Sequence, residues 1–478
     1  MRAGGFEVIL LRRQGRRDEA RKRLRYWQAL DPTSSLLRHE AAKLRSEDPG
    51  LVRHLAGDPE RILEIAVEYM GLGLWDDALE LLSRSWPEDG VLAEVGTPPP
   101  RTYSLLAYYR GYCREKTGGS GRGDFAAAAA LPTTYVFPNR PESLPVLRRA
   151  LAVDPSDAGA HFLLGSLLLS GGQVDGALEQ WQEARRLNPR LPVLHRNLGM
   201  TRLYARGDAA DALETFEEGM GVDPGNLALY LGADQALSLL GRPVGDRLRD
   251  LRRFPDLAKA PPSLVFKLAL ALTEAGRAAE AEALFARRFF PREEGGTNVR
   301  QVYLEVRLRH AEALAREGRR QDALAIVRSL PRPVAGLAFT RDGLADFIQE
   351  ARFQYRLGLV MALCGDKAAA RAHWEKAEKA HDTPSLAPVY SFLVAQRLGR
   401  PDENERRSRL EQTLADSEAS LQRGSAFPGA VTYAQGLMLR ALGREQEARE
   451  RFRRVFLLPD LRLSHFLARR ALEAQDPL

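Results

Sequence analysis

The stretch GSLLLSGGQVDGALEQWQEARRLNP, residues 165–189, carries small, aromatic and proline residues at regular intervals. Counted from Gly165, the residues Ala177, Trp181, Ala184 and Pro189 stand at offsets of 12, 16, 19 and 24. Catalytic motifs seldom space such residues in this way, whereas repeated helical units do. The first question is therefore whether the same intervals recur along the chain.

The intervals recur several times. The sets that match them are Gly358, Ala370, Trp374 and Ala377; Gly436, Ala448, Phe452 and Val455; and, one residue late, Gly199, Ala212, Phe216, Gly219 and Pro224. We attribute the late set to one extra residue in RGDAADA. The N-terminal residues Gly15, Ala20, Leu24, Trp27 and Pro32 repeat the intervals that begin at Gly172, and weaker copies centre on 73–82, 276–285 and 318–327.

Each copy predicts two antiparallel helices joined by a tight turn. Gly165 leaves room where the second helix crosses the first, and the turn glycine reaches positive φ without steric cost. Ala177, Trp181 and Ala184 form one buried stripe at the spacing i, i+4, i+7. The following proline then ends the second helix. The spacing thus reflects packing and not chemistry.

This pattern resembles the tetratricopeptide repeat, with about eight copies. The resemblance implies an all-α fold, a right-handed superhelical solenoid of antiparallel helix pairs. We expect an N-terminal hairpin and connection over 1–56, and an array over 57–260 with Pro- and Gly-rich insertions at 87–101 and 116–145. A continuing array over 261–478, ending in a capping helix at 463–475, completes the expected organisation.

The composition agrees with a helical scaffold that lacks cofactors. The 478 residues are 44% hydrophobic and 28% charged, and no apolar run approaches the length of a membrane helix. The two cysteines, Cys113 and Cys364, provide neither a disulfide framework nor a metal motif. We expect two buried thiols, no cofactor, no metal and, in the absence of a signal peptide, a cytoplasmic location.

The net charge of +7 comes from arginine-rich clusters at 12–25, 247–253 and 449–454. Acidic residues are interleaved with them, and the clusters lie far apart in the array. A surface that follows a phosphate backbone needs aligned basic side chains. We therefore expect solvated faces and no nucleic-acid partner.

A second resemblance appears at two interruptions of the array. Residues 133–169 and 286–318 resemble the C-terminal repeat region of uncharacterised bacterial proteins that carry an N-terminal β-sandwich similar to galactose mutarotase. The matching positions are Tyr135, Phe137, Pro138, Arg140, Glu142 and Ser143, then Arg287, Arg288, Phe289, Pro291, Glu293, Gly295 and Gly296. No segment resembles the sandwich itself. The alternative to a scaffold is therefore the helical half of a bipartite, carbohydrate-related protein whose β-sandwich domain is missing from this chain. Within the first interruption, TTYVF (133–137) is the one segment that reads as a strand.

The N-terminus agrees with that alternative. Met1 falls near the start of a first helix, and Phe6, Val8, Ile9 and Leu10 make this start apolar. An open end of a solenoid exposes the face meant for a neighbour. We therefore expect the chain to be a fragment, or a subunit whose N-terminal face another polypeptide covers.

No residues form a convincing catalytic group. His161 and His195 occupy equivalent places four residues before Gly165 and Gly199, where packing is the expected role. His373 and His381 are a poor metal pair. GGSGRGD (118–124) lacks the residues that complete a phosphate loop, and Glu293 and Glu294 diverge as neighbours in sequence. We therefore predict that the chain is not an enzyme.

The remaining candidate site is the concave groove of the superhelix. Residues three before and one after each Gly165-type position are expected to line it, giving an aromatic and apolar surface with few charges. These candidates are Tyr108, Tyr112, Phe162, Ser166, Arg196, Met200, Tyr355, Leu359, Tyr433 and Leu437. Such a groove suits a peptide or a helix of a protein partner. The alternative is that these side chains pack inward and the protein fills its own groove.

Overall fold

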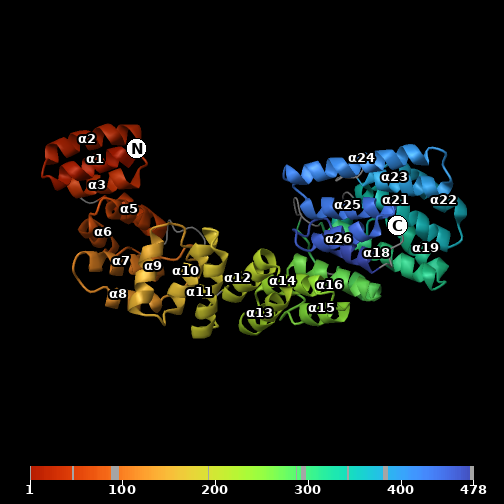
Figure 1. Ribbon diagram of the computed structural model, residues 1–478, viewed down its shortest axis with the longest axis horizontal. Helices are drawn as coiled ribbons and strands as arrows, with labels where there is room; N and C mark the ends of the chain where they lie inside the picture. Colours follow the sequence, from red (N-terminus) through yellow and green to blue (C-terminus); the bar gives the residue numbers. More distant parts are fainter. Residues whose placement is uncertain are drawn as a thin grey trace. The chain divides into compact units, whose positions relative to one another are not determined.

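A computed structural model describes residues 2–45, 48–87, 96–191, 193–286, 288–291, 298–341, 344–380 and 386–473. The chain divides into two compact units, which we call the N-terminal unit (Met1–Thr201) and the C-terminal unit (Arg202–Leu478) and describe separately. The described residues form α-helices joined by turns and loops, with no strand among them (Figure 1). The predicted all-α fold of antiparallel helix pairs is confirmed.

The described part of the N-terminal unit contains twelve α-helices. They are α1 (Arg2–Arg13), α2 (Arg17–Leu30), α3 (Ser35–Leu44), α4 (Pro49–Ala56), α5 (Pro59–Gly71), α6 (Trp75–Leu82), α7 (Ser104–Lys116), α8 (Arg122–Ala129), α9 (Ser143–Val153), α10 (Ala158–Ser170), α11 (Val174–Leu187) and α12 (Leu194–Thr201).

The C-terminal unit opens with a π-helical turn (Arg202–Arg206) and continues, within its described ranges, with fifteen α-helices. They are α13 (Ala209–Val222), α14 (Leu227–Leu239), α15 (Val244–Leu251), α16 (Pro262–Glu274), α17 (Ala278–Ala283), α18 (Val299–Arg316), α19 (Arg320–Ser329), α20 (Leu344–Ile348), α21 (Ala351–Leu363), α22 (Lys367–Lys379), α23 (Ala387–Leu398), α24 (Glu403–Gln422), α25 (Pro428–Ala441), α26 (Glu445–Val455) and α27 (Ser464–Leu472).

The hairpin α10–α11 shows why the small and aromatic residues recur. Asp157 caps α10 by accepting a hydrogen bond from the Ala160 amide (2.9 Å). A Cβ atom at Gly165 would lie 2.6 Å from the ring of Trp181, so only glycine permits this approach. Trp181 is 1% exposed, and its Nε1–H donates to the Phe162 carbonyl oxygen (3.0 Å). The predicted burial of Trp181 is confirmed.

The same contact recurs in the C-terminal unit. Gly358 of α21 faces the ring of Trp374 on α22, and the Trp374 Nε1–H donates to the Tyr355 carbonyl oxygen (3.1 Å). Gly436 of α25 faces the ring of Phe452 on α26 in the same way. One rule of close helix approach therefore builds hairpins in both units.

The repeat that begins at Gly199 contains one extra residue, and this residue lies earlier in the chain than the segment RGDAADA to which we attributed it. Gly207 adopts φ 69°, as Gly172 does at 75°, and each stands five residues before the alanine that starts the buried stripe. The interval after the turn is therefore unchanged, and the additional residue sits in the π-helical turn Arg202–Arg206. A π turn takes in one residue more than an α turn, so the insertion lies before the turn glycine Gly207 and not after it.

The interruption at 116–145 is more ordered than the sequence indicated. Residues 122–129 form α8, where Phe125 packs beneath Gly111 of α7. Asp124, the acidic residue of the RGD triplet, accepts hydrogen bonds from Arg110 and Arg114 (2.6 Å each). The strand expected at 133–137 is wrong, because these residues form a loop in which Tyr135 has φ 59°.

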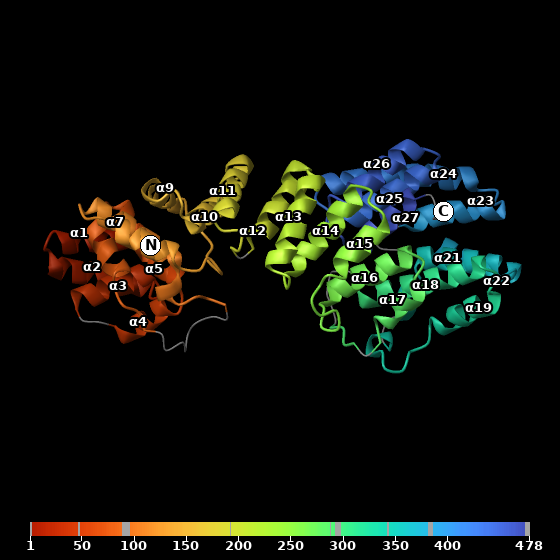
Figure 2. The same ribbon diagram turned by 90° about the horizontal axis from the view of Figure 1, so that it is seen from below.

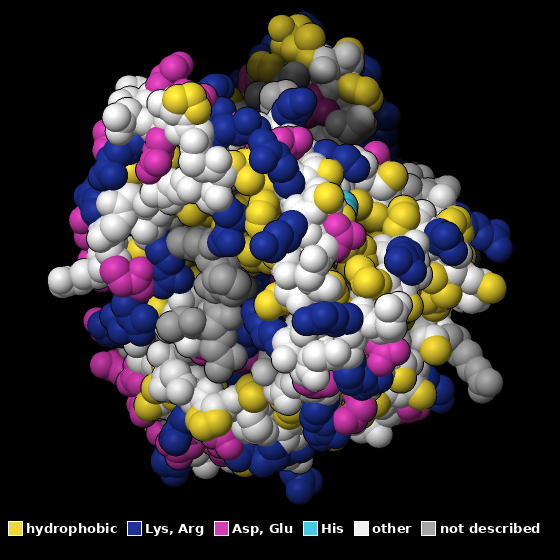
Figure 3. Space-filling view, turned by 90° about the vertical axis from the view of Figure 1, so that its right-hand side faces the viewer, with side chains coloured by type: hydrophobic (Ala, Val, Ile, Leu, Met, Phe, Trp, Pro, Cys, Tyr) yellow, Lys and Arg dark blue, Asp and Glu magenta, His cyan; other side chains and the backbone are white. Residues whose placement is uncertain are grey.

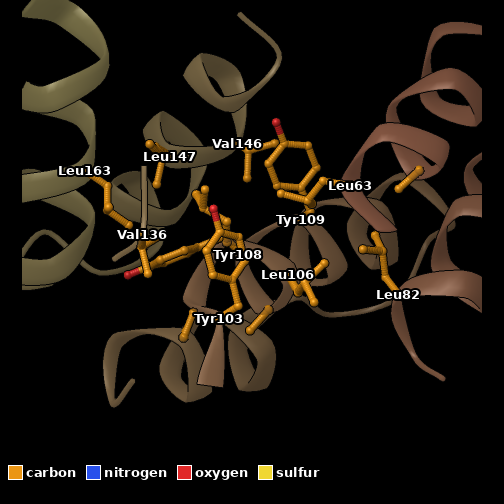
Figure 4. Close-up of a cluster of buried hydrophobic side chains, with 14 of the residues drawn as sticks. Leu63, Leu82, Tyr103, Leu106, Tyr108, Tyr109, Val136, Val146, Leu147 and Leu163 are labelled. Carbon is orange, nitrogen blue, oxygen red and sulfur yellow. The ribbon is translucent and has the colours of Figure 1, made fainter. Parts of the chain in front are cut away.

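The core of the N-terminal unit gathers around two tyrosines of α7. Tyr108 and Tyr109 are fully buried among leucine and valine side chains from α5, α6, α9 and α10 (Figure 4). Each hydroxyl group has a partner: Tyr108 donates to Asp157 (2.8 Å), and Tyr109 shares a hydrogen bond with Ser143 (2.8 Å). These contacts connect α7 to the helices that follow it.

The apolar start of α1 is better covered than expected. Val8 and Ile9 are buried, because α1 packs against both α2 and α3. Phe6 is half-buried and Leu10 is exposed. The expectation of an uncovered face is therefore wrong for Val8 and Ile9.

In the C-terminal unit the first helices of successive pairs pack in chain order. Contacts run from α14 to α16, α18, α21, α23, α25 and finally α27 (Figures 1 and 2). The last helix also returns to the first ones: Arg469 of α27 hydrogen-bonds to Ser238 of α14 (3.1 Å) and Glu274 of α16 (3.2 Å). The inner helices of this unit therefore close on one another. No helix of the described residues is long and apolar enough to cross a membrane.

Replacing Trp181 by alanine tests the hairpin contact. We expect Trp181→Ala to lower the free energy of unfolding by about 3–5 kcal/mol, because it leaves a cavity beneath Gly165 and removes the bond to Phe162. Chemical denaturation measures the loss, and hydrogen exchange should show weakened amide protection in α10 and α11. Phe137→Ala, at a side chain that is 66% exposed in the same unit, is the control. Equal effects of the two substitutions would contradict this account of the fold.

Candidate functional site

Six of the ten predicted groove positions belong to the N-terminal unit, and two of these are buried. Tyr108 lies in the core with its hydroxyl on Asp157, and Phe162 lies beneath the Trp181 contact. Burial raises the pKa of Asp157 despite its hydrogen bonds from Ala160 and Tyr108. These residues therefore position α7 and α10 and have little surface for a ligand.

Tyr112 is half-buried at the end of α7. Its ring meets the Trp75 ring of α6 edge-on at 6.1 Å, and the Lys116 ammonium lies 5.2 Å from the Tyr112 ring centre. The ammonium is also 5.8 Å from the Trp75 ring. Tyr112 thus joins an aromatic pair with a cation above it, a contact of the kind that stabilises partly exposed surfaces.

Three half-buried positions come from α10 and α12. Ser166 donates its hydroxyl proton to the Phe162 carbonyl oxygen (3.0 Å). Arg196 donates to the side-chain oxygen of its neighbour Asn197 at 3.1 and 3.3 Å, and Met200 follows one turn later. Of the ten candidates, these three and Tyr112 keep accessible surface.

All four positions in the C-terminal unit are buried. Tyr355 packs against Tyr390 at a ring distance of 5.4 Å, and its hydroxyl accepts a hydrogen bond from Arg397 (3.1 Å). Tyr433 packs against Phe452 at 5.8 Å, and Leu359 and Leu437 are also buried. A ligand could reach these side chains only if neighbouring helices moved.

The first helices carry buried charges that sequence reasoning missed. Glu305 of α18 accepts hydrogen bonds from Arg309 (2.8 Å), Arg352 (2.5 Å) and Arg356 (3.0 Å). Burial alone would raise the pKa of Glu305, but these arginines outweigh it and hold the pKa far below its usual range. Arg356 also pairs with Glu312 (2.5 Å). The rule that chose the ten groove positions did not include these charged residues of α18 and α21.

A second buried network joins four helices of the same unit. Arg247 of α15 donates to Asp234 of α14 and to Glu274 of α16, both at 2.8 Å. Arg469 of α27 also donates to Glu274. Burial would raise the pKa of Glu274, yet Arg469 and Arg247 lower it.

The first network had a signal in the sequence. The spacing i, i+4, i+7 of Glu305, Arg309 and Glu312 puts all three side chains on one helix face.

Two histidines, His161 and His195, lie within hydrogen-bond distance of the loops that precede their helices. His161 Nε2 lies 3.1 Å from the Pro155 carbonyl oxygen, and His195 Nε2 lies 2.8 Å from the Pro189 carbonyl oxygen. At the equivalent place, Tyr230 donates to the Pro224 carbonyl oxygen (2.9 Å). The same position in these three repeats thus holds the loop before the first helix.

Several residues singled out in the sequence lie outside the described ranges: Arg287, Glu293, Glu294, Gly295, Gly296 and His381.

The remaining polar chemistry supports structural roles. Burial raises the pKa of Cys113 to about 12 and also raises the pKa of Cys364, which disfavours a reactive thiolate. Within the described ranges, no group of three or more His, Cys, Asp or Glu side chains is placed to hold a metal ion. On the face shown in Figure 3, basic and acidic side chains are interspersed.

The family comparison concerns the hairpin at the centre of the N-terminal unit. The tetratricopeptide repeat family model matches residues 139–192, which include α9, α10 and α11. Residues 139–192 therefore carry a tetratricopeptide-like repeat. The comparison with curated proteins found no match.

Several solved structures are similar to the chain. A thermophilic tetratricopeptide repeat protein from Thermus thermophilus is 21% identical, with 44% of this chain and 98% of that chain covered and a TM-score of 0.23. A tetratricopeptide repeat protein from Parabacteroides merdae is 14% identical, with 70% and 98% covered and a TM-score of 0.23. Human IFIT1, in a dimer with m7Gppp-AAAA, is 15% identical, with 95% and 88% covered and a TM-score of 0.26.

Removing the charge of Glu305 tests the buried network. We expect Glu305→Gln to cost about 3–5 kcal/mol of unfolding free energy at pH 7, because three arginines lose their shared carboxylate. The depressed pKa means that this stabilisation is present above the ordinary glutamate pKa of about 4.3 and is lost as the pH falls below it. Denaturation at several pH values should therefore show the wild-type advantage shrinking in acid.

The matched control is Glu411→Gln. Glu411 forms an exposed pair with Arg407 (3.5 Å), which is worth little. A Glu305→Gln variant as stable as Glu411→Gln at pH 7 would contradict the assigned network.

Proposed function

We propose that the chain is a non-enzymatic scaffold and that its N-terminal unit binds a peptide or a helix of a partner protein. The observation that carries this proposal is the accessible set Ser166, Arg196 and Met200 on successive first helices. Ser166 lies within the segment that matches the repeat family.

The chemistry of these side chains suggests what the partner carries. Arg196 has five N–H donors, and its hydrogen bonds to Asn197 Oδ1 use two of them. Its guanidinium therefore suits a carboxylate of the partner. Met200 offers a flexible apolar surface beside it. We infer that the site favours a segment with an acidic residue next to an apolar one.

A peptide library displayed against the full chain tests this proposal. We expect selected peptides to combine an acidic and an apolar residue, and to bind Arg196→Glu about tenfold or more weakly, because a charge-assisted hydrogen bond becomes a repulsion. Arg190→Glu, at an exposed loop position, is the control and should leave binding unchanged. Peptides that bind Arg196→Glu and the wild type equally would place the site elsewhere.

A second candidate function is that of the helical half of a bipartite, carbohydrate-related protein. It is favoured by three exposed aromatic side chains at the positions of the second resemblance: Tyr135 is 60% exposed, Phe137 is 66% exposed and Phe289 is 82% exposed. Arginines hold both loops, since Arg140 donates to Glu60 (2.9 Å) and Arg288 donates to the carbonyl oxygens of Ala260 and Leu257. Each loop, one in each compact unit, therefore offers an exposed and anchored ring to a β-sandwich domain or subunit.

The DNA next to this reading frame can be searched for a region that encodes a β-sandwich domain, which would be the partner to test. Where one is encoded, we expect its polypeptide to co-purify with the chain, and Phe137→Ser or Phe289→Ser, tested separately, to weaken that association at least about tenfold. Leu457→Ser, at an exposed apolar position away from both loops in sequence, is the control. Association that survives each single substitution would rule out both loops as docking sites.

A further inference from the structure

The last helix of the C-terminal unit is enclosed on almost every side. In α27, residues Ser464–Ala471 are all buried, including Arg469 and Arg470. A helix that merely caps a solenoid presents a polar outer face to water. The burial of α27 instead resembles that of an occupant within a binding site.

The contacts of α27 come from the two preceding helices and from helices far away in sequence. It packs against α25 and α26 (Figure 2), Phe466 lies under the Arg309 guanidinium of α18 at 5.8 Å, and Arg469 bonds to Ser238 and Glu274. The connection that leads into it is also fastened, because Lys267 of α16 forms an ion pair with Asp460. The first helices of this unit thus recognise α27 through one aromatic ring and one arginine.

The hinge before α27 is strained. Arg462 has φ 55° and Leu463 has φ 62°, two consecutive residues in the left-handed region that disfavours side chains with a Cβ atom. Such strain persists only where surrounding contacts enforce it. Here the enforcing contacts are those of α27 itself, together with Arg462 stacked 4.1 Å over the Phe427 ring.

We infer that α27 is exchangeable. The surface that receives it, formed by α14, α16, α18, α25 and α26 and called here the inner face, also accepts α27 from a second copy of the chain. In the exchanged dimer each inner face receives the same ring and the same arginine, so the contacts are conserved. Each hinge can then extend and release its left-handed residues. Strained hinges next to a docked terminal element are the usual setting for such swapping.

Two observations favour a second copy over another occupant. A second copy necessarily supplies the side chains that this face already fits, Phe466 and Arg469 at their spacing of three. The seven residues 457–463 also span about 24 Å when extended, which exceeds the distance of about 10 Å between the axes of packed helices. The exchange involves the C-terminal unit alone, so it stands or falls independently of the peptide site proposed above.

A pair of hinge variants tests the exchange in the full chain. Glycine at position 462 adopts positive φ freely, whereas proline cannot, and both lose the stacking on Phe427. We expect Arg462→Gly to weaken dimerisation about tenfold and Arg462→Pro to strengthen it about tenfold, as measured by size-exclusion chromatography with light scattering over a concentration series. Dimerisation that is equal in the two variants, or absent in both at the highest concentration, would overturn the inference.

A labelled peptide of residues 459–473 shows whether α27 is the exchanged element. We expect the peptide to bind Arg462→Pro and convert its dimer into a one-to-one complex, while a peptide carrying Arg469→Glu does not. A dimer that the peptide leaves intact would mean association through another surface. Where Arg462→Pro fails to fold, mixing two differently tagged wild-type populations gives the answer: tag exchange that Arg462→Gly slows supports the inference, and tag exchange that it leaves unchanged refutes it.

Discussion

The close approach of two helices at a residue without a side chain is the contact on which this structure depends. At Gly165 the missing Cβ lets the Trp181 ring lie against the first helix, where its indole N–H reaches the Phe162 carbonyl oxygen. That carbonyl already serves the helix, so the indole bond satisfies a buried donor without disturbing the backbone ladder. Because Gly358 and Trp374 repeat the arrangement, each hairpin forms a unit that needs only its neighbours.

This contact also explains how much of the fold could be predicted. Spacing alone indicated the hairpins, their turns and the burial of Trp181, since these follow from local geometry that the sequence records residue by residue. The strand expected at 133–137 was wrong because a strand needs a pairing partner, and β propensity depends strongly on such neighbours. The position of the inserted residue was missed because counting reveals an extra residue only between two landmarks, and not which turn absorbs it.

The candidate site was harder to predict than the fold. The rule that selected Tyr355 and Tyr433 identifies which side of a first helix they occupy, but not whether another helix covers that side. The Tyr355 hydroxyl, for example, meets Arg397 of α23, which stands 42 residues further along the chain. The buried carboxylates were missed for the same reason. Glu305 is costly to bury alone, and its ion pairs with Arg352 and Arg356 compensate that cost. Long-range neighbours of this kind leave little trace in a local spacing rule.

The π-helical turn Arg202–Arg206 has a consequence for how the array can evolve. In a repeat protein each hairpin packs only on its neighbours, so an insertion between two hairpins leaves the packing within each hairpin intact. The π-helical turn takes in the extra residue here, and the division between the two compact units falls at this turn. Each half is then free to accumulate its own inner-face chemistry, a cluster of paired charges in one and an accessible arginine and methionine in the other.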